Sequence, residues 1–279
     1  MKAHVTFPSG DIVPALGQGT WKMAQTADCR AQEILALRQG IDLGMTLIDT
    51  AEMYAEGAAE VLVAEAISGQ RDRVFLVSKV YPWNASSQLL AQSCEASLRR
   101  LNTDRIDLYL LHWRGEVPLE ETIAGMEKLV ARGLIRNWGV SNFDPDDMDD
   151  LIAAGGQSCA TNQILYNLTR RGPEFDLLPL MEGRGIPAMA YSPVEQGRLA
   201  SHTGLAALAG DLGLTAAQLA LAWVLNRPGT IAIPKAGSRA HVLANHAAAQ
   251  VDLVTHEDVL LQLDRIFPAP DRARPLEMI

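Results

Sequence analysis

The stretch Leu47-Ile-Asp-Thr-Ala-Glu-Met-Tyr54 decides the fold when it is read together with Ser78-Lys79 and Leu111-His112. An acid, an amine and an imidazole each come at or near the end of an apolar run that is typical of a strand: Asp49 in run 46–49, Lys79 in run 74–79 and His112 in run 106–112. If these runs are successive parallel strands, the three groups and the phenol of Tyr54 meet at one mouth of the sheet. In a closed (β/α)8 barrel, catalytic residues are expected at that mouth.

Strand-like runs alternate with helical periodicity along the rest of the chain. We expect strands at 16–21, 46–49, 74–79, 106–112, 135–140, 159–162, 188–191 and 230–233, and helices at 28–44, 58–67, 86–101, 119–132, 145–154, 174–184, 215–226 and 239–249. This alternation demands a parallel sheet with helical crossovers. The number of units, the absence of a G-x-G-x-x-G turn and the polar residues at nearly every strand end favour a (β/α)8 TIM barrel over an open doubly wound sheet.

Both ends of the chain add to the repeating part. Residues 4–13 predict a small β-hairpin around Pro8-Ser-Gly-Asp11, which could cover the closed end of the barrel. The segment that follows strand 188–191 is expected to be a longer loop. After residue 251 we expect a short tail helix at 257–266 and then a Pro-rich end that packs outside the barrel or over its rim. Because single barrels typically run to about 250 residues, residues 1–279 are expected to form one domain.

Composition excludes several classes of protein. The formal charge is −9, with acidic and basic residues interspersed, which argues against a nucleic-acid or anionic-membrane surface. The three cysteines, Cys29, Cys94 and Cys159, lack any C-x-x-C spacing and suggest neither disulfides nor a metal site. The start of the chain shows no signal-peptide pattern, and no apolar window approaches the roughly 20 residues of a spanning helix. We therefore expect a cytoplasmic monomer that contains no metal.

The four polar groups suit proton donation better than covalent catalysis. A phenol has a pKa of about 10, and a neighbouring ammonium favours the phenolate, so Lys79 is expected to lower the pKa of Tyr54. Asp49 can hold Lys79 by a charge-assisted hydrogen bond, and His112 can orient a carbonyl oxygen. Taken singly, Asp49 could be a turn residue or helix cap, Tyr54 an ordinary loop residue and His112 a core histidine. Lys79 is harder to explain by packing, because lysine is rarely buried without a partner.

The chain resembles the aldo-keto reductases along nearly its whole length. The resemblance is carried by Gly19-Thr-Trp21, Leu47–Tyr54, Val77-Ser-Lys79, Asp107-Leu-Tyr-Leu-Leu-His-Trp113, Gly139-Val-Ser-Asn-Phe143, Asn162-Gln163, Ala190-Tyr-Ser-Pro193 and Ile233-Pro-Lys235. It implies a barrel that uses NADPH, with Asp49, Tyr54, Lys79 and His112 as the catalytic tetrad. By this similarity, hydride passes from the nicotinamide to a carbonyl carbon while Tyr54 protonates the oxygen.

The same resemblance implies a set of cofactor contacts. Ser141, Asn142 and Gln163 match positions that bind the carboxamide, and Tyr191 matches the aromatic ring that stacks on the nicotinamide. The pyrophosphate loop would contain Ser192, Pro193, Val194, Gln196 and Gly197, and further contacts are implied for Gly19, Thr20, Trp21, Asp49, Ile233, Pro234 and Ala236. At the adenosine end Lys235, Ser238 and Asn245 match phosphate and adenine contacts. His241 stands where the family commonly has an arginine, so we predict NADPH preference with weaker discrimination against NADH.

Substrate choice rests on fewer residues. Trp21, Trp83 and Trp113 match positions in the pocket wall, beside Tyr54 and His112, and would form a largely apolar recess. The short loop 114–118 and the short tail predict a shallow, open site. Val80-Tyr-Pro-Trp-Asn84 and Ile233-Pro-Lys-Ala236 resemble bacterial members that reduce methylglyoxal, so we expect an NADPH-dependent reductase of small ketoaldehydes and aromatic aldehydes.

Two other functions stay open from the sequence. One is a cofactor-binding barrel that serves as a regulatory or binding subunit, against which the complete tetrad weighs. The other is a barrel lyase or isomerase that handles phosphate, because Ile233-Pro-Lys-Ala-Gly-Ser238 could mimic a phosphate-binding loop.

Overall fold

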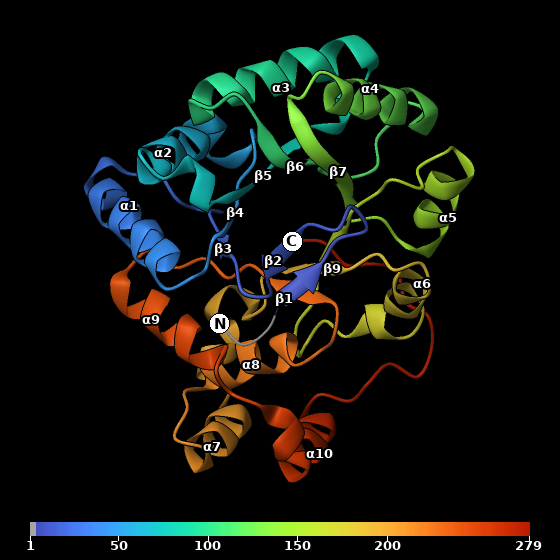
Figure 1. Ribbon diagram of the computed structural model, residues 1–279. Coiled ribbons are helices and arrows are strands. Elements are labelled where there is room, and N and C mark those ends of the chain that lie inside the picture. Colours follow the sequence, from blue (N-terminus) through green and yellow to red (C-terminus); the bar gives the residue numbers. More distant parts are fainter. Residues whose placement is uncertain (1–3) are drawn as a thin grey trace.

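The computed structural model describes residues 4–279 and shows a barrel of parallel strands surrounded by helices (Figure 1). Within these residues the eight-stranded sheet follows chain order from β3 to β10. Its strands are β3 Gln18–Gly19, β4 Leu47–Asp49, β5 Phe75–Val80, β6 Ile106–Leu111, β7 Ile135–Ser141, β8 Asn162–Leu165, β9 Ala188–Tyr191 and β10 Thr230–Ala232. The two edges meet, because Gly17 N donates to Ala232 O at 2.9 Å and Gly19 N donates to Pro234 O at 3.1 Å. The predicted (β/α)8 barrel is confirmed.

The helices lie outside the sheet, and most of them bury one apolar face against it (Figure 1). They are α1 Ala27–Asp42, α2 Ala58–Ile67, α3 Ser87–Leu101, α4 Leu119–Ala131, α5 Pro145–Ala153, α6 Leu177–Gly183, α7 Thr203–Asp211, α8 Ala216–Leu225, α9 Arg239–Ala248 and α10 Glu257–Ile266. Helices α7 and α10 instead pack in a second apolar cluster with α8. Helix α7 was expected to be loop. Gly204 and Gly210 weaken its helical pattern, and it is stabilised instead by Leu205 and Leu208, which pack in one apolar cluster with residues of α8 and α10.

Two other predicted elements differ from the structure. The strand expected at 159–162 lies later in the chain, at β8, Asn162–Leu165. These four residues pair with β9 along their whole length. The helix expected at 174–184 is a short turn, Gly172–Glu174, followed by α6. Helix α6 begins later because the Asp176 side chain caps it by accepting a hydrogen bond from Leu177 N.

The N-terminal hairpin covers the base of the barrel, as predicted. Strands β1 (His4–Thr6) and β2 (Ile12–Pro14) pair antiparallel, with Val5 opposite Val13. Phe7 stacks on Phe75 of β5 with ring centroids 5.5 Å apart. The hairpin side chains therefore join the apolar core inside the barrel.

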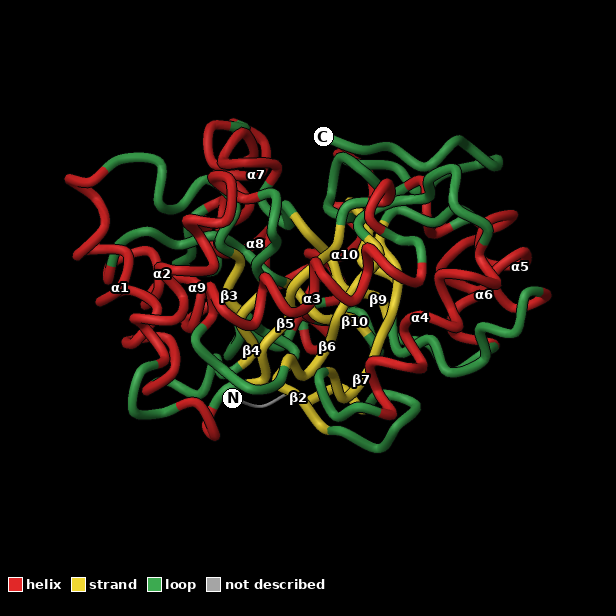
Figure 2. Tube along the Cα trace, turned by 90° about the horizontal axis from the view of Figure 1, so that it is seen from above, coloured by secondary structure: helices red, strands yellow, loops and turns green. Residues whose placement is uncertain are grey.

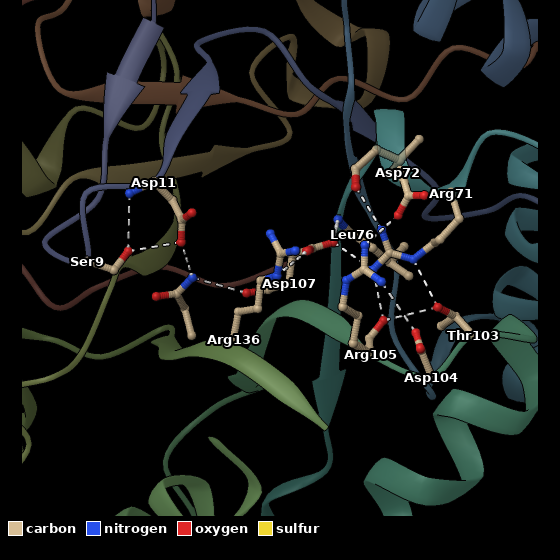
Figure 3. Close-up of polar contacts among 12 residues, drawn as sticks. Ser9, Asp11, Arg71, Asp72, Leu76, Thr103, Asp104, Arg105, Asp107 and Arg136 are labelled. Atoms are coloured by element: carbon tan, nitrogen blue, oxygen red, sulfur yellow. Dashed lines mark hydrogen bonds and ion pairs between the residues drawn. The ribbon is translucent and has the colours of Figure 1, made fainter. Parts of the chain in front are cut away.

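A polar network fixes the hairpin to the base (Figure 3). Asn137 Nδ2 donates to Asp11 Oδ2 at 2.7 Å and to the carbonyl oxygen of Asp107 at 3.2 Å. The Asp107 carboxylate accepts from Arg71 Nη2 at 2.7 Å and from Leu76 N at 2.8 Å. Buried polar contacts hold this end of the barrel together. We therefore assign them a role in the stability of the fold.

The alternation of side chains along each strand places polar groups at the opposite end. Leu47, Val77 and Leu110 belong to the apolar core inside the barrel. Because side chains alternate between faces, the residues two positions further on also point inward. These residues are Asp49, Lys79 and His112, so the mouth of the barrel is lined by the polar groups that the sequence singled out.

The C-terminal tail reaches the mouth after α10. Figure 2 shows the C-terminus at the end of the barrel opposite to strand β2 of the hairpin. The tail therefore lies over the rim, as one of the two predicted arrangements. Among residues 4–279 no single helix is long and apolar enough to cross a bilayer, although α7 and α8, bent by 80° from each other, reach that length and composition as a pair.

Candidate active site

Lys79 lies at the centre of a hydrogen-bonded group at the mouth of the barrel. Its Nζ donates to Asp49 Oδ2 at 2.8 Å, to the carbonyl oxygen of Thr50 at 2.9 Å and to Tyr54 Oη at 2.9 Å. Lys79 is fully buried, and Asp49 and Tyr54 are nearly so. All three hydrogens of the ammonium are therefore used. The predicted contact between amine and phenol is present.

Burial controls the protonation of this group. Burial, followed by the charge of Asp49, raises the pKa of Tyr54 well above its usual value. Burial also lowers the pKa of Lys79, although the Asp49 charge opposes this shift. The expectation of a lowered pKa for Tyr54 is therefore wrong in direction, because loss of solvent raises it. Tyr54 is a neutral phenol near pH 7. Since its oxygen accepts from Lys79, its own hydrogen is free to be donated.

His112 is a neutral imidazole beside the phenol. Burial, followed by the charge of Lys79, lowers the pKa of His112 to about 2. Its ring centroid lies 5.9 Å from that of Tyr54. Its Nδ1 is buried and has no hydrogen-bond partner among the described residues. A neutral imidazole can donate one hydrogen bond without adding charge, which suits it to orient a carbonyl oxygen.

A cavity of about 760 Å³ extends from these groups along the rim of the barrel. Most of the predicted site residues line it, from strand ends far apart in the sequence: Gly19, Trp21, Asp49, Tyr54, His112, Trp113, Ser141, Asn142, Gln163, Tyr191, Ser192, Pro193, Val194, Gln196, Ile233, Pro234, Lys235 and His241. The barrel therefore brings together at one mouth the catalytic, cofactor and substrate residues implied by the motifs.

Other predicted residues lie outside the cavity wall: Thr20, Lys79, Trp83, Gly197, Ala236, Ser238 and Asn245. Thr20 is buried and its Oγ1 donates to Asp49 O at 3.0 Å, so it supports the site from behind. Trp83 does not form the predicted wall. It is 59% exposed, stacks on Tyr81 with ring centroids 4.3 Å apart and packs edge-on against the lining residue Trp113 at 5.8 Å.

Five lining residues were not predicted: Lys22, Met53, Gly237, Met278 and Ile279. Lys22 Nζ donates to Gln196 Oε1 at 2.7 Å and so joins the loops after β3 and β9. Met278 and Ile279 belong to the tail, which therefore adds a wall to a site that was expected to be shallow and open. An irregular tail has no periodicity, so no pattern in the sequence indicates where it lies.

Amide and hydroxyl groups that line the cavity are joined to one another by hydrogen bonds. Gln163 Nε2 donates to Asp49 Oδ1 at 2.8 Å. Tyr191 Oη donates to Asn142 Oδ1 at 2.9 Å, and Asn142 Nδ2 donates to His112 O at 3.1 Å. Asn142 also adopts a left-handed conformation with φ of 59°. Such strain in a residue with a side chain is typical of functional sites.

The far end of the cavity carries a cation beside a helix N-terminus. Lys235 and His241 both line it, and α9 begins between them. A Cβ atom at Gly237 would lie 2.8 Å from Lys235 Nζ, so the glycine leaves room for the ammonium. Lys235 Nζ lies 4.0 Å from the buried carboxylate of Glu33. A cation and the N–H groups of a helix start together suit an anion such as phosphate.

Comparisons with known proteins agree with this geometry. The family model described as "Aldo/keto reductase family" matches residues 15–264. The chain is 54% identical over 278 residues to the methylglyoxal reductase YeaE of Escherichia coli strain K12, with 97% of each chain covered. A crystal structure of an aldo/keto reductase from Klebsiella pneumoniae in complex with NADP and acetate has a TM-score of 0.96 and 53% identity over 100% of both chains. A second structure from that organism, in complex with NADPH, has the same TM-score and identity over 100% of both chains. The chain therefore belongs to the aldo/keto reductase family and is an oxidoreductase, as its motifs predicted.

Proposed function

We propose that the protein reduces small aldehydes and ketoaldehydes, such as methylglyoxal and aromatic aldehydes, to alcohols with NADPH, and that Tyr54 is the general acid. The observation that carries this proposal is the buried hydrogen bond of 2.9 Å from Lys79 Nζ to Tyr54 Oη. It leaves a neutral phenol at the wall of a cavity large enough for a ligand. The name of the similar protein from Escherichia coli supports the choice of methylglyoxal.

The residues along the cavity fit a nicotinamide dinucleotide. Gln163 and Asn142 offer amide donors and acceptors for a carboxamide, and Tyr191 offers an aromatic face at the same end. Lys235 and the start of α9 offer positive charge at the other end. A Cβ at Gly19 would lie 2.6 Å from Ile233 O, so only glycine fits at this closely packed part of the wall. When bound, NADPH would supply a hydride for the carbonyl carbon.

The protein itself would supply the proton and control the charge. Tyr54 donates its hydroxyl hydrogen to the carbonyl oxygen as negative charge develops there, and Lys79 stabilises the phenolate that remains. Asp49 fixes Lys79 in place through a hydrogen bond of 2.8 Å. His112 orients the carbonyl oxygen towards the phenol as a neutral donor. Its low pKa prevents it from competing with Tyr54 as a proton source near pH 7.

The cavity wall favours small carbonyl compounds. Trp21 packs edge-on against Tyr54 with ring centroids 4.9 Å apart, and Trp113 lies beside His112 at 5.0 Å. Met278 and Ile279 add further apolar surface from the tail. Two indoles and two aliphatic side chains around one proton donor give an apolar recess with few polar groups for recognition. Activated short aldehydes need little recognition beyond their carbonyl group.

Lys235 and His241 would set the choice between NADPH and NADH. Lys235 provides a fixed positive charge for a 2′-phosphate, whereas His241 lacks the planar fork with which an arginine binds phosphate. We expect NADPH to be preferred, but by a smaller margin than a lysine and an arginine together would give. A ratio of kcat/KM values that favours NADH would contradict this assignment.

One chain forms the whole cavity, which supports a monomer as the working unit and residues 1–279 as one domain. Cys29, Cys94 and Cys159 are all free thiols, which supports a reducing compartment such as the cytoplasm. The complete group of Asp49, Lys79 and Tyr54 argues against a barrel that only binds cofactor. In such a subunit Tyr54→Phe would leave the function unaltered.

A panel of carbonyl compounds tests the proposal. NADPH oxidation is followed optically with methylglyoxal, phenylglyoxal and benzaldehyde, using wild type and Tyr54→Phe. We expect turnover of the ketoaldehydes by wild type and a loss of about a thousandfold in the variant. Failure of the wild type to turn over any activated aldehyde would overturn the proposed function.

A further inference from the structure

A second buried carboxylate lies behind the active site, on the outer face of the barrel. Glu60 of α2 is completely buried. Its Oε1 accepts from Ser78 Oγ at 2.6 Å, and its Oε2 accepts from Nε of Arg100 on α3. Arg100 Nη2 also donates to Ser97 Oγ at 3.1 Å. A carboxylate removed from water is stable only when it is paired in this way.

This pair lies directly behind the catalytic lysine. Ser78 and Lys79 are neighbours on β5, so their side chains leave the strand on opposite faces. Lys79 points inward to Asp49 and Tyr54, while Ser78 points outward to Glu60. Glu60 does not line the cavity. Any effect of Glu60 on the reaction must therefore pass through β5 or through the turn that carries Tyr54.

The turn that carries Tyr54 has an unusual backbone. Ala55 has φ 49° and ψ 41°, Glu56 has φ 54° and ψ 38°, and Gly57 has φ 87°. Two successive residues with a Cβ atom in the left-handed region are unfavourable without support from their surroundings. The position of the Tyr54 oxygen depends on this turn, because Tyr54 immediately precedes it.

Arg100 supports this turn from both sides. A Cβ atom at Gly57 would lie 2.6 Å from Arg100 Cδ, so the arginine stem packs directly against the backbone at the end of the turn. On the other side, Arg100 Nη2 lies 4.0 Å from Oε2 of Glu52, two residues before Tyr54. Glu52 is itself fixed, since its Oε1 accepts from Tyr81 N at 2.8 Å.

From these contacts we propose that Arg100 and Glu60 are a positioning pair for the general acid. Glu60 anchors the guanidinium to β5 through Ser78, and the guanidinium holds the turn 52–57 so that the Tyr54 oxygen stays within reach of Lys79 and the substrate. This inference rests on the proposed function of Tyr54. Neither Arg100 nor Glu60 touches the reacting atoms.

Substitutions on α3 test the pair. Arg100→Met removes the charge and the fork but keeps an unbranched stem, and Arg99→Met on the same helix is the matched control, because Arg99 is exposed. We measure kcat and KM for phenylglyoxal and the Kd of NADPH by fluorescence. Displacement of a reacting group by 1 Å can cost about a hundredfold, so we expect kcat to fall at least about tenfold in Arg100→Met. The Kd of NADPH should stay within about twofold, because its contacts lie on other loops, and Arg99→Met should match wild type.

Two further measurements separate a loss of Tyr54 positioning from a loss of folded protein: activity of a rescue variant, and the number of NADPH sites. Arg100→Lys keeps a cation for Glu60 and should recover part of the lost kcat. The number of NADPH sites per chain is titrated, and kcat is expressed per site. A kcat per site equal to wild type, whether or not fewer sites remain, would overturn the inference. Glu60→Gln, which keeps the volume and an acceptor for Ser78, takes the same test if Arg100→Met does not fold. If wild type and Arg99→Met turn over no aldehyde, the proposed function fails and the inference with it.

Discussion

Two buried aspartates at opposite ends of the barrel are paired with different cations. At the base, Asp107 accepts from Arg71 Nη2 at 2.7 Å (Figure 3), and at the mouth Asp49 accepts from Lys79 Nζ at 2.8 Å. Both aspartates are 2% exposed. A guanidinium keeps its proton in a protein, whereas a buried amine can lose one. The ion pair at the base is therefore permanent, whereas burial at the mouth lowers the pKa of Lys79.

Arg71 and Lys79 also differ in the groups that accept their hydrogen bonds. Arg71 donates to Thr103 Oγ1 at 3.0 Å, Val74 O at 2.8 Å and Arg105 O at 2.8 Å in addition to Asp107. Lys79 shares its hydrogens with Tyr54, whose own hydrogen faces a cavity. The base uses its hydrogen bonds within the protein, while the mouth keeps donors available for a ligand. This difference explains why one end of a (β/α)8 barrel stabilises the fold and the other carries chemistry.

The largest effect is expected from Tyr54→Phe. The phenyl ring keeps the packing against Trp21, but one hydrogen of the buried Lys79 ammonium loses its acceptor, so the free energy of unfolding should fall by about 1–3 kcal/mol. Without the hydroxyl group no proton is donated, and kcat/KM should fall about a thousandfold. Steady-state kinetics and urea denaturation of the same preparations measure both quantities. A loss of activity below about tenfold would mean that another group supplies the proton.

Asp107→Asn should produce the opposite outcome at the base. The variant leaves the charge of Arg71 largely buried without a counter-ion, which should lower the free energy of unfolding by about 3 kcal/mol. The kcat per folded molecule should equal that of wild type. Chemical denaturation measures the stability, and Asp72→Asn is the control because Asp72 is an exposed partner of Arg105. An equal decrease in the free energy of unfolding in both variants would show that the burial of Asp107 does not increase its contribution to stability.

The neutral imidazole at the mouth should make stability depend on pH. The pKa of His112 is lowered from 6.5 to about 2, so between these values the unfolded chain binds more protons than the folded one. The contribution of His112 to the free energy of unfolding is therefore fully present above the unfolded pKa and is lost as the pH falls below it. At pH 5 this loss is about 2 kcal/mol. Denaturation curves of wild type and His112→Gln at pH 7 and pH 5 measure the difference. The same pH dependence in both proteins would refute a buried, neutral His112.

The smallest effect concerns the far end of the cavity. Lys235→Met removes the fixed charge that we propose faces a 2′-phosphate, and kcat/KM for NADPH should fall about tenfold, which corresponds to about 1.4 kcal/mol. The value for NADH should stay unchanged, since NADH lacks that phosphate. Lys128→Met, an exposed residue on α4, is the control. Equal losses with both cofactors would place Lys235 at a different part of the ligand.

Local patterns in the sequence predict most of the mouth. Asp49, Lys79 and His112 each continue the inward face of a strand, so alternation alone places them together once the barrel is recognised. The pKa of Tyr54 could not be predicted, because its direction depends on how completely the fold removes water from the phenol. The position of Trp83 could not be predicted either, because its contacts with Tyr81 and Trp113 depend on how the loops after β5 and β6 pack.

Irregular segments account for the remaining differences. Helix α7 depends on packing against α8 and α10 more than on its own periodicity, since it contains Gly204 and Gly210. Met278 and Ile279 reach the cavity at the end of a Pro-rich tail without a repeating pattern. Long-range packing decides both positions, and a single sequence contains no local signal of it.

The most direct measurement is the rate of NADPH oxidation in a single turnover with phenylglyoxal, compared between Tyr54→Phe and Asp107→Asn. We predict that Tyr54→Phe reacts about a thousandfold more slowly than wild type, while folded Asp107→Asn reacts at the wild-type rate. A Tyr54→Phe enzyme that reacts as fast as wild type would contradict the assignment of Tyr54 as the proton donor.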